Sequence, residues 1–229
     1  MTLIETIDAA RLLVNEPLDS SRTFPDNTST FWKDSELITY FNMVQNDVSV
    51  EIMQTFEDYF LTHSDLAITS GCANYTLPTR FVKARRLEDR RSSYPTEIYP
   101  VTINERVAGY PEITNDGMNN RVVGGYFLAG NNIMFHDTPT FTNASAIRLY
   151  YVRALADVTA ATATSEIPPE HHRLLVWGIV KYCLFQQQSD TSKADVEYDK
   201  MMAKLKGQCE NRQIQRPRAV KSNYYPKRY

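Results

Sequence analysis

The sequence is poor in the residues from which most enzyme and metal motifs are built. Its 229 residues include only three cysteines, with no CxxC spacing, and only eight glycines. An odd number of unclustered cysteines argues against a disulfide framework and against a zinc module. No GxGxxG, Walker A, GxSxG or EF-hand pattern occurs. These absences predict a non-enzymatic protein with no cofactor and no metal site.

Long apolar runs are also missing. Mean hydropathy is −0.42, and no segment approaches the ~18 consecutive apolar residues that a membrane-spanning helix needs. The segment Met1–Glu5 lacks the basic and long apolar regions of a secretory signal. With 42% hydrophobic and 23% charged residues, the composition is typical of a packed globular protein. No membrane partner is expected, and the chain is long enough for one large domain or two small ones.

Acidic residues are absent after Glu210, and this absence divides the charge of the chain. The whole sequence has a formal net charge of −2, which suggests no partner. Residues 1–210 carry 19 basic and 27 acidic groups, a formal charge of −8, whereas residues 211–229 carry six basic groups alone. The sequence therefore predicts an acidic body with a cationic tail, two regions with different tasks.

Four segments have the apolar spacing of helices. Thr2–Val14 is a short helix whose Thr2 and Glu5 fit a capping box. A long helix is predicted from Asp34 to His63, with Asp34 or Ser35 as its cap and one apolar stripe that ends at Tyr59. A further helix opens at Pro168–Pro169 and continues to Gln188, and the last spans Ser192–Cys209.

Between residues 70 and 153 the apolar period falls towards two, which is typical of strands. Gly130–Asn132 has the composition of a hairpin turn. Short strands close in sequence favour an antiparallel sheet or a small sandwich over parallel βαβ units. The predicted strands are Asn74–Pro78, Phe81–Leu87, Thr96–Ile103, Tyr126–Ala129, Ile133–Phe135 and Ala146–Val152.

These elements predict an α+β fold in which helices from both ends of the chain form one bundle and an antiparallel β region is inserted between them. No helix buries its stripe alone, so the N-terminal and C-terminal helices must pack together. The expected divisions are residues 1–69 and 157–210 for the bundle, 70–156 for the inserted β domain and 211–229 for an extended arm.

Few residues suggest chemistry. His171 and His172 are neighbours, so on a helix they point about 100° apart and cannot share one metal ion; surface histidines of a first turn are expected. His136–Asp137 follows a predicted strand and could form a dyad, although a single pair identifies no reaction class. Cys183 and Cys72 are interpreted as structural cysteines, because no base and orienting group accompany them in sequence.

A second basic region lies within the predicted β domain. Lys83–Arg91 contains five basic residues together with Glu88 and Asp89. A nucleic-acid contact is one interpretation. The favoured interpretation is a solvated strand edge, since charged side chains discourage edge-to-edge pairing and the two acids reduce the local field.

The tail combines cations with aromatic residues and has too few aliphatic residues for a core. Tyrosine and arginine dominate interface hot spots, so the tail is predicted to be a docking arm. The same composition could bind phosphates and stack on bases. The residues proposed for docking are Arg212, Arg216, Arg218, Lys221, Tyr224, Tyr225, Lys227, Arg228 and Tyr229.

The order of these features resembles the head-to-tail adaptor (connector) proteins of tailed bacteriophages. Phe31–Leu37 is similar to the family's tryptophan, cap and Glu-Leu pair at the start of its long helix, and Tyr75–Pro78 to the beginning of its β region. Asn132–Pro139 with Leu149–Tyr151 resembles its closing strands. Ile167–Glu170 followed by Leu174–Leu175 resembles the start of its C-terminal helical pair. The resemblance covers about residues 3–206.

The resemblance implies a structural virion protein at the neck of the phage, made in the host cytoplasm and assembled as a ring, typically of twelve copies. Its implied partners are the portal protein, tail or nozzle proteins, other copies of itself, and passing DNA that is not bound specifically. An acidic body fits a channel through which DNA is ejected, because tight phosphate binding would impede passage.

Two other functions stay open at this point. One is a nucleic-acid-binding module that uses the tail and residues 83–91. The other is an enzyme, such as a hydrolase that uses His136 and Asp137.

Overall fold

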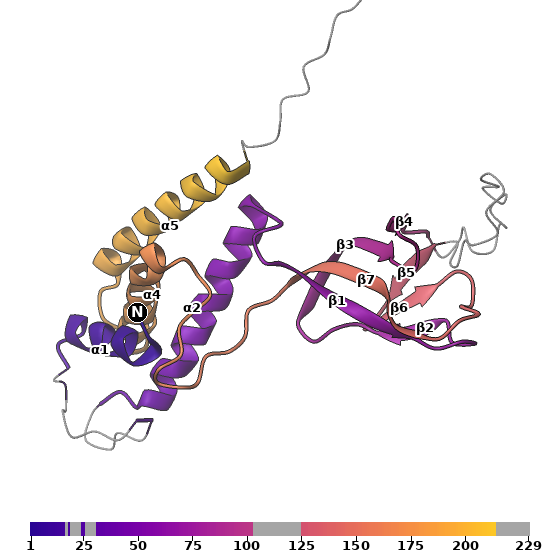
Figure 1. The fold of residues 1–229 in the computed structure, drawn as a ribbon. Helices are drawn as coiled ribbons and strands as arrows, with labels where there is room; N and C mark the ends of the chain where they lie inside the picture. Colours follow the sequence, from indigo (N-terminus) through magenta and orange to yellow (C-terminus); the bar gives the residue numbers. More distant parts are fainter. Residues whose placement is uncertain (17, 19–23, 26–30, 103–124, 214–229) are drawn as a thin grey trace, which may run out of the picture. The chain divides into compact units, whose positions relative to one another are not determined.

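The computed structural model describes residues 1–229 except 17, 19–23, 26–30, 103–124 and 214–229 (Figure 1). The chain divides into two compact units. The helical unit combines residues 1–57 with the C-terminal part from Asp157, and the β unit comprises Asp58–Ala156. The predicted α+β class is confirmed, with helices at both ends of the chain and antiparallel strands inserted between them.

Helix α1 (Leu3–Leu13) forms as the sequence predicts. The Glu5 amide donates to the Thr2 hydroxyl at 3.4 Å, and the Glu5 carboxylate accepts from the Thr2 amide at 2.8 Å, so the capping box is confirmed. Leu3, Ile7 and Ala10 on one face are buried. The same face includes Arg11, which has no exposed surface.

Helix α2 (Asp34–Thr55) is shorter than predicted at its C-terminal end. Its buried stripe includes Leu37, Phe41, Val44, Val48 and Ile52, as expected. The predicted extension to His63 is wrong, because the chain leaves the helix at Phe56 and enters strand β1 at Leu61. Neither glycine nor proline marks this end in the sequence; pairing of β1 with another strand determines it.

The start of α2 also differs from the prediction. Its N-cap is Lys33, and the Glu36 carboxylate accepts a hydrogen bond from the Lys33 amide at 3.1 Å. Neither Asp34 nor Ser35 is the cap. Asp34 is instead fully buried and binds Arg11.

The C-terminal part of the helical unit contains a helical pair. The 3₁₀ turn η1 (Pro169–His171) leads directly into α4 (His172–Gln186), and α5 spans Ser192–Gln213. Helices α1, α2 and α5 all pack on α4, which explains why α4 is apolar on nearly every side. Helix α5 continues four residues beyond the predicted Cys209.

Gly178 brings α4 and α2 close together. A Cβ built on Gly178 would lie 2.4 Å from Cγ1 and 2.7 Å from Cγ2 of Val44. Such distances are far below van der Waals contact, so only glycine permits this approach. The crossing of the N-terminal and C-terminal helices therefore depends on one residue without a side chain.

The β unit contains two antiparallel sheets. Strands β1, β7, β3 and β4 follow one another in the first sheet, and β2, β6 and β5 in the second. Residues 130–131 connect β5 to β6 in the predicted hairpin, with Gly130 at a φ of 57°. The strands are β1 (Leu61–Ile68), β2 (Asn74–Thr76), β3 (Phe81–Asp89), β4 (Thr96–Ile98), β5 (Tyr126–Ala129), β6 (Asn132–Phe135) and β7 (Asn143–Arg153).

Both sheets contribute to one apolar core, so the β unit is a small two-sheet sandwich. Leu66, Leu87 and Leu149 enter this core from the first sheet, and Ile133 and Phe135 enter from the second. The strand region starts before residue 70, because β1 pairs with β7 along almost its whole length. Part of the predicted strand Thr96–Ile103 lies outside the described residues.

Candidate functional site

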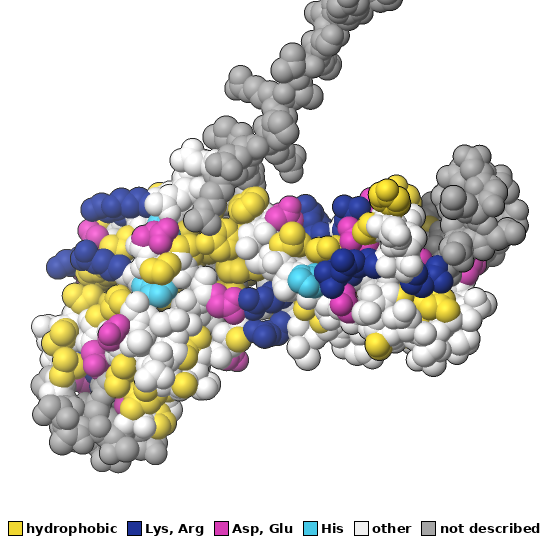
Figure 2. Space-filling model, viewed as in Figure 1, with side chains coloured by type: hydrophobic (Ala, Val, Ile, Leu, Met, Phe, Trp, Pro, Cys, Tyr) yellow, Lys and Arg dark blue, Asp and Glu magenta, His cyan; other side chains and the backbone are white. Residues whose placement is uncertain are grey.

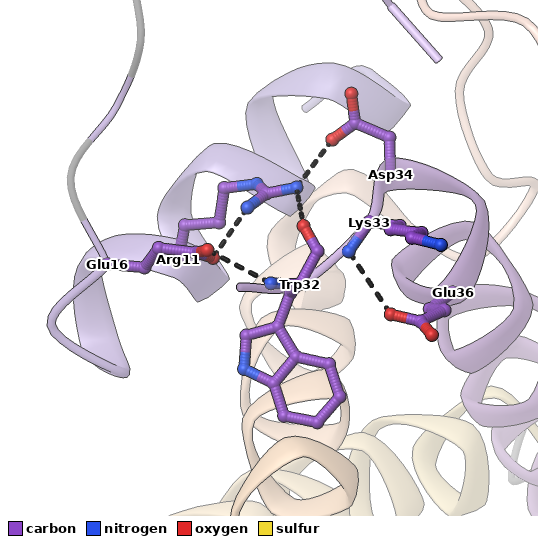
Figure 3. A network of polar contacts seen from close by, with 6 residues as sticks. All are labelled: Arg11, Glu16, Trp32, Lys33, Asp34 and Glu36. Atoms are coloured by element: carbon purple, nitrogen blue, oxygen red, sulfur yellow. Dashed lines mark hydrogen bonds and ion pairs between the residues drawn. The ribbon is translucent and has the colours of Figure 1, made fainter. Parts of the chain in front are cut away.

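A buried polar network joins the end of α1 to the start of α2 (Figure 3). The Arg11 guanidinium donates to Oε2 of Glu16 at 2.5 Å, to Oδ1 of Asp34 at 2.7 Å and to the Trp32 carbonyl at 2.7 Å. Oε1 of Glu16 accepts from the Trp32 amide at 3.0 Å. A forked guanidinium can serve two carboxylates at once, which an ammonium cannot do with the same geometry. The network fixes where α2 begins relative to α1.

A polar hollow of about 500 Å³ lies where the start of α4 meets the second half of α5. Met201 gives it apolar surface in front of the fully buried Leu174, while the exposed side chains of Arg173 and Lys204 give it positive charge. Glu170 is its carboxylate, and Gln208 and Asn211 add amides. Figure 2 shows dark-blue Lys and Arg side chains over the part of the view that α5 occupies. The hollow is not evident in the sequence, because two separate segments, 170–174 and 201–211, form it.

The two neighbouring histidines are buried, so the prediction of surface histidines is wrong. His171 is 7% exposed and its Nε2 lies 2.6 Å from Oε1 of Gln208 on α5. His172 is 3% exposed, and its Nε2 lies 2.8 Å from the Ile167 carbonyl oxygen. They point to different partners, as their spacing predicts. Both histidines anchor the start of α4.

The cations of β3 and the segment after it are largely paired with carboxylates. Arg85 lies 2.6 Å from Asp58, and Arg86 lies 3.1 Å from Glu88. Arg91 binds Asp89 through two nitrogens and lies over the Phe141 ring. In each pair the carboxylate neutralises a positive charge that could otherwise bind a nucleic-acid phosphate. This pairing disfavours residues 83–91 as a nucleic-acid site.

Another ion pair crosses the first sheet. Arg148 on β7 donates to both carboxylate oxygens of Asp65 on β1, at 2.6 and 3.0 Å. This hydrogen bonding lowers the pKa of the Asp65 carboxyl. The cross-strand ion pair holds the two charges together and supports the register of β1 against β7.

The edge prediction for Lys83–Arg91 holds for part of β3. Strand β4 pairs only with Leu87, Glu88 and Asp89, so the preceding half of β3 has no β4 partner. Two bulges interrupt its pairing with β7, at Phe81–Lys83 and at Ala84–Arg86. These bulges overturn the simple alternation on which the face assignments of Lys83, Arg85 and Arg86 rested.

The remaining candidates give no catalytic arrangement. Nδ1 of His136 lies 2.9 Å from Oδ1 of Asp137, but Nε2 of His136 is buried and faces no polar partner within the described part of the chain. A general base needs access to the proton that it removes. Among the described residues, no group of three or more histidine, cysteine, aspartate or glutamate side chains could hold a metal ion.

The cysteines differ in reactivity. Cys183 on α4 is 1% exposed, and burial raises the pKa of its thiol to about 12. Cys209 on α5 is 2% exposed, whereas Cys72 in the β unit is partly exposed and donates to the Asn74 carbonyl. The thiolate is the reactive form, so Cys183 is inert at neutral pH. Cys183 and Cys209 are structural, as predicted for Cys183.

We predict that a thiol reagent at pH 8 modifies one cysteine of the folded protein within minutes and three after unfolding. At that pH about one Cys183 in ten thousand is a thiolate. Absorbance of the released chromophore measures the number of modified thiols. The variant Cys72→Ser should lose the fast reaction completely. Fast modification of two thiols in the wild-type protein would contradict the burial of α4 and α5.

Most of the predicted docking arm lies outside the described residues. Arg212 belongs to the last turn of α5, which ends at Gln213. The other eight proposed docking residues, from Arg216 to Tyr229, lie in the range 214–229. Residues 211–213 of the predicted arm belong to α5, and Asn211 lines the hollow.

The family comparison decides the identity of the chain. A family model described as SU10 adaptor protein matches residues 1–222 and so spans the helical unit, the β unit and the start of the arm. The chain belongs to the SU10 adaptor protein family. No curated protein matches it.

SU10 adaptor proteins form a phage head-to-tail adaptor family, so the resemblance seen in the sequence is confirmed. Membership makes this protein a structural virion component, and the family is not an enzyme family. Among the described residues, none of the helices combines the length and apolar character that crossing a membrane requires. For an SU10 adaptor, the candidate functional sites are contact surfaces rather than a catalytic centre.

Proposed function

We propose that the protein forms a ring-shaped adaptor between the phage portal and the tail at the neck of the virion. The observation that carries this proposal is the family match over residues 1–222, which includes both units. In this proposal the helical unit forms the ring, typically of twelve copies, and the β unit faces tail or nozzle proteins. DNA passes through the ring during ejection without specific binding.

The distribution of charge supports a ring that lets DNA pass. Residues 1–57 and 157–210, the helical unit without the arm, carry 9 basic and 18 acidic groups, a formal charge of −9. The β unit carries 10 basic and 9 acidic groups. Phosphate binding depends on an excess of Lys and Arg over acidic residues. The helical unit has no such excess, and the β unit has an excess of one basic group. The body of the protein therefore suits contact with proteins more than with DNA.

The arm is proposed to dock on the portal. Arg212 belongs to the last turn of α5, and the other five cations and the tyrosines Tyr224, Tyr225 and Tyr229 come after its end in the sequence. Tyrosine and arginine supply large contact area and paired hydrogen bonds in protein interfaces. A segment that orders only when it docks adds contact area without enlarging the core of the protein, although ordering it costs free energy.

Deletion of Ser222–Tyr229 should leave a folded protein that binds portal rings at least about 100-fold more weakly. Loss of one tyrosine hot spot costs about 2 kcal/mol or more, and the deletion removes three tyrosines. Circular dichroism measures folding, and biolayer interferometry with immobilised portal rings measures affinity. Electron microscopy of the mixture shows whether rings form on the portal.

Two further variants separate the contributions of the arm. Replacing the three tyrosines by serine keeps its charge, and replacing Lys221, Lys227 and Arg228 by glutamine keeps its aromatic residues. The first should weaken binding at all salt concentrations, and the second chiefly at low salt. If the deletion variant bound portal rings with unchanged affinity, the arm would not be the docking element.

A further inference from the structure

The hollow between α4 and α5 contains two cations without a carboxylate partner. Arg173 and Lys204 take part in no ion pair within the described part of the chain, whereas Lys181, Lys200 and Lys206 each lie against an acidic side chain. The unit around them is strongly acidic by sequence. An unpaired cationic hollow on an acidic unit is the arrangement expected for a contact with carboxylates.

Gly207 keeps one wall of this hollow open. It lies in the interior of α5, where glycine destabilises a helix relative to alanine. Packing does not require it, because a Cβ built on Gly207 would meet no atom within 4 Å. This is the opposite of Gly178, whose Cβ would collide with Val44. A missing side chain at this position leaves room for a group from outside the molecule.

A complementary surface lies on the solvent side of α2. Glu36, Met43, Asp47 and Val50 are separated by seven, four and three residues, so they form one stripe along the helix. Met43 is 44% and Val50 47% exposed, and both carboxylates are exposed. Met43 and Val50 lie on the side of α2 away from the buried Phe41 and Ile52. The Asp47 carboxylate lies nearer α4 and accepts a hydrogen bond from the Tyr182 hydroxyl at 3.3 Å. Carboxylates and apolar side chains alternate along the stripe, in the order Glu36, Met43, Asp47 and Val50.

We propose that the hollow of one copy receives the α2 stripe of a second copy. Arg173 and Lys204 would then face carboxylates, and Met201 would meet apolar side chains. The hollow and the stripe are different surfaces, so the contact is heterologous, the type that closes into rings. The inference rests on the proposed ring and assigns its subunit contact.

The arm is a poor occupant of the hollow. No acidic residue follows Glu210, and six basic residues do. Arg173 and Lys204 would repel such a segment. A second copy offers what the hollow lacks, namely exposed carboxylates with apolar neighbours.

Charge reversal tests the pairing of the two surfaces. Arg173→Glu with Lys204→Glu makes the hollow negative, and Met43→Lys with Asp47→Lys makes the stripe positive. Each double variant alone should associate at least 100-fold more weakly than the wild-type chain. An equimolar mixture should assemble again as alternating copies, because each reversed surface then meets its complement. Native mass spectrometry of the full chain, alone and bound to portal rings, counts the copies.

Single substitutions with unchanged charge give the steric test. Gly207→Leu should block the hollow and weaken association at least tenfold, while Gly207→Ala should preserve it.

The charge-reversal test has its own control. Lys193→Glu, at an exposed position of α5 outside the hollow, should assemble normally. Equal helicity and melting temperature show that each variant is folded.

The outcomes separate this inference from the proposed function. If the wild-type chain assembles on portal rings and all variants do so equally, the subunit contact is wrong and the adaptor role stands. If the reversed variants fail both alone and mixed, the hollow has another occupant, such as the portal itself. If the wild-type chain stays monomeric up to about 100 µM and also fails to bind portal rings, both proposals fail.

Discussion

Arg11→Ala is expected to lower the free energy of unfolding by about 3–5 kcal/mol, among the largest effects of any single substitution in the helical unit. Arg11 is fully buried, and its removal leaves the buried carboxylates of Glu16 and Asp34 without their cation. It also removes the donor that satisfies the Trp32 carbonyl. Urea denaturation followed by circular dichroism measures the loss. A midpoint within experimental error of wild type would show that the network contributes nothing to stability.

Companion variants identify the cause. Lys193→Ala removes an exposed cation from α5 and should change stability by less than about 0.5 kcal/mol. The triple variant Arg11→Met, Glu16→Gln, Asp34→Asn removes all three charges at once and should recover a large part of the loss, because no charge is then buried alone. If the triple variant were as unstable as Arg11→Ala, lost packing of the long arginine side chain would explain the effect instead.

The structural role of Arg11 could have been suspected from the sequence but not assigned. Arg11 follows Ile7 by four residues, so it lies on the apolar face of α1, where an arginine requires a partner. The partners are five and 23 residues away, and nothing local connects them. Asp34 was predicted as a helix cap, because aspartate at the start of a helix usually has that role. Only the fold reveals that its carboxylate faces Arg11.

Periodicity predicted most element types and missed one strand. Residues 34–52 repeat a clear apolar stripe, and the helix follows it. Tyr59 continues the same spacing by chance beyond the end of α2 at Thr55, so the pattern alone predicts a longer helix. Strand β1 forms there because β7 pairs with it, and the paired residues are 75 to 91 positions apart in the chain. Local propensity gives way to pairing at long range.

The distribution of charge along the sequence predicted which regions are acidic or basic, but not which side chains form ion pairs. The acidic body and cationic tail are visible in the sequence, and the structure assigns the excess acid to the helical unit. Whether a particular cation is free depends on the fold. Arg85 and Arg86 sit in a basic run yet face carboxylates, whereas Arg173 and Lys204 are scattered in sequence and meet in one hollow. The cations available for contact are therefore outside the cluster that the sequence emphasises.

Gly178→Ala is expected to destabilise the protein by about 2–3 kcal/mol, although alanine is the better helix former. The added methyl group would lie 2.4 Å from Cγ1 of Val44, and both residues are buried where α4 crosses α2. Overpacking of this kind forces the helices apart or moves side chains off their rotamers. Gly207→Ala is the matched control on α5; with no atom near its Cβ, it should stabilise by up to about 1 kcal/mol.

A double-mutant cycle with Val44→Ala separates steric overlap from every other cause. Val44→Ala removes both methyl groups that the new Cβ would meet, so the second substitution should cost far less in that background. The expected coupling is about 1–3 kcal/mol, measured from urea denaturation of the four proteins. Additive losses would show that the two side chains do not compete for space. The close approach of α2 and α4 would then not be what requires glycine at position 178.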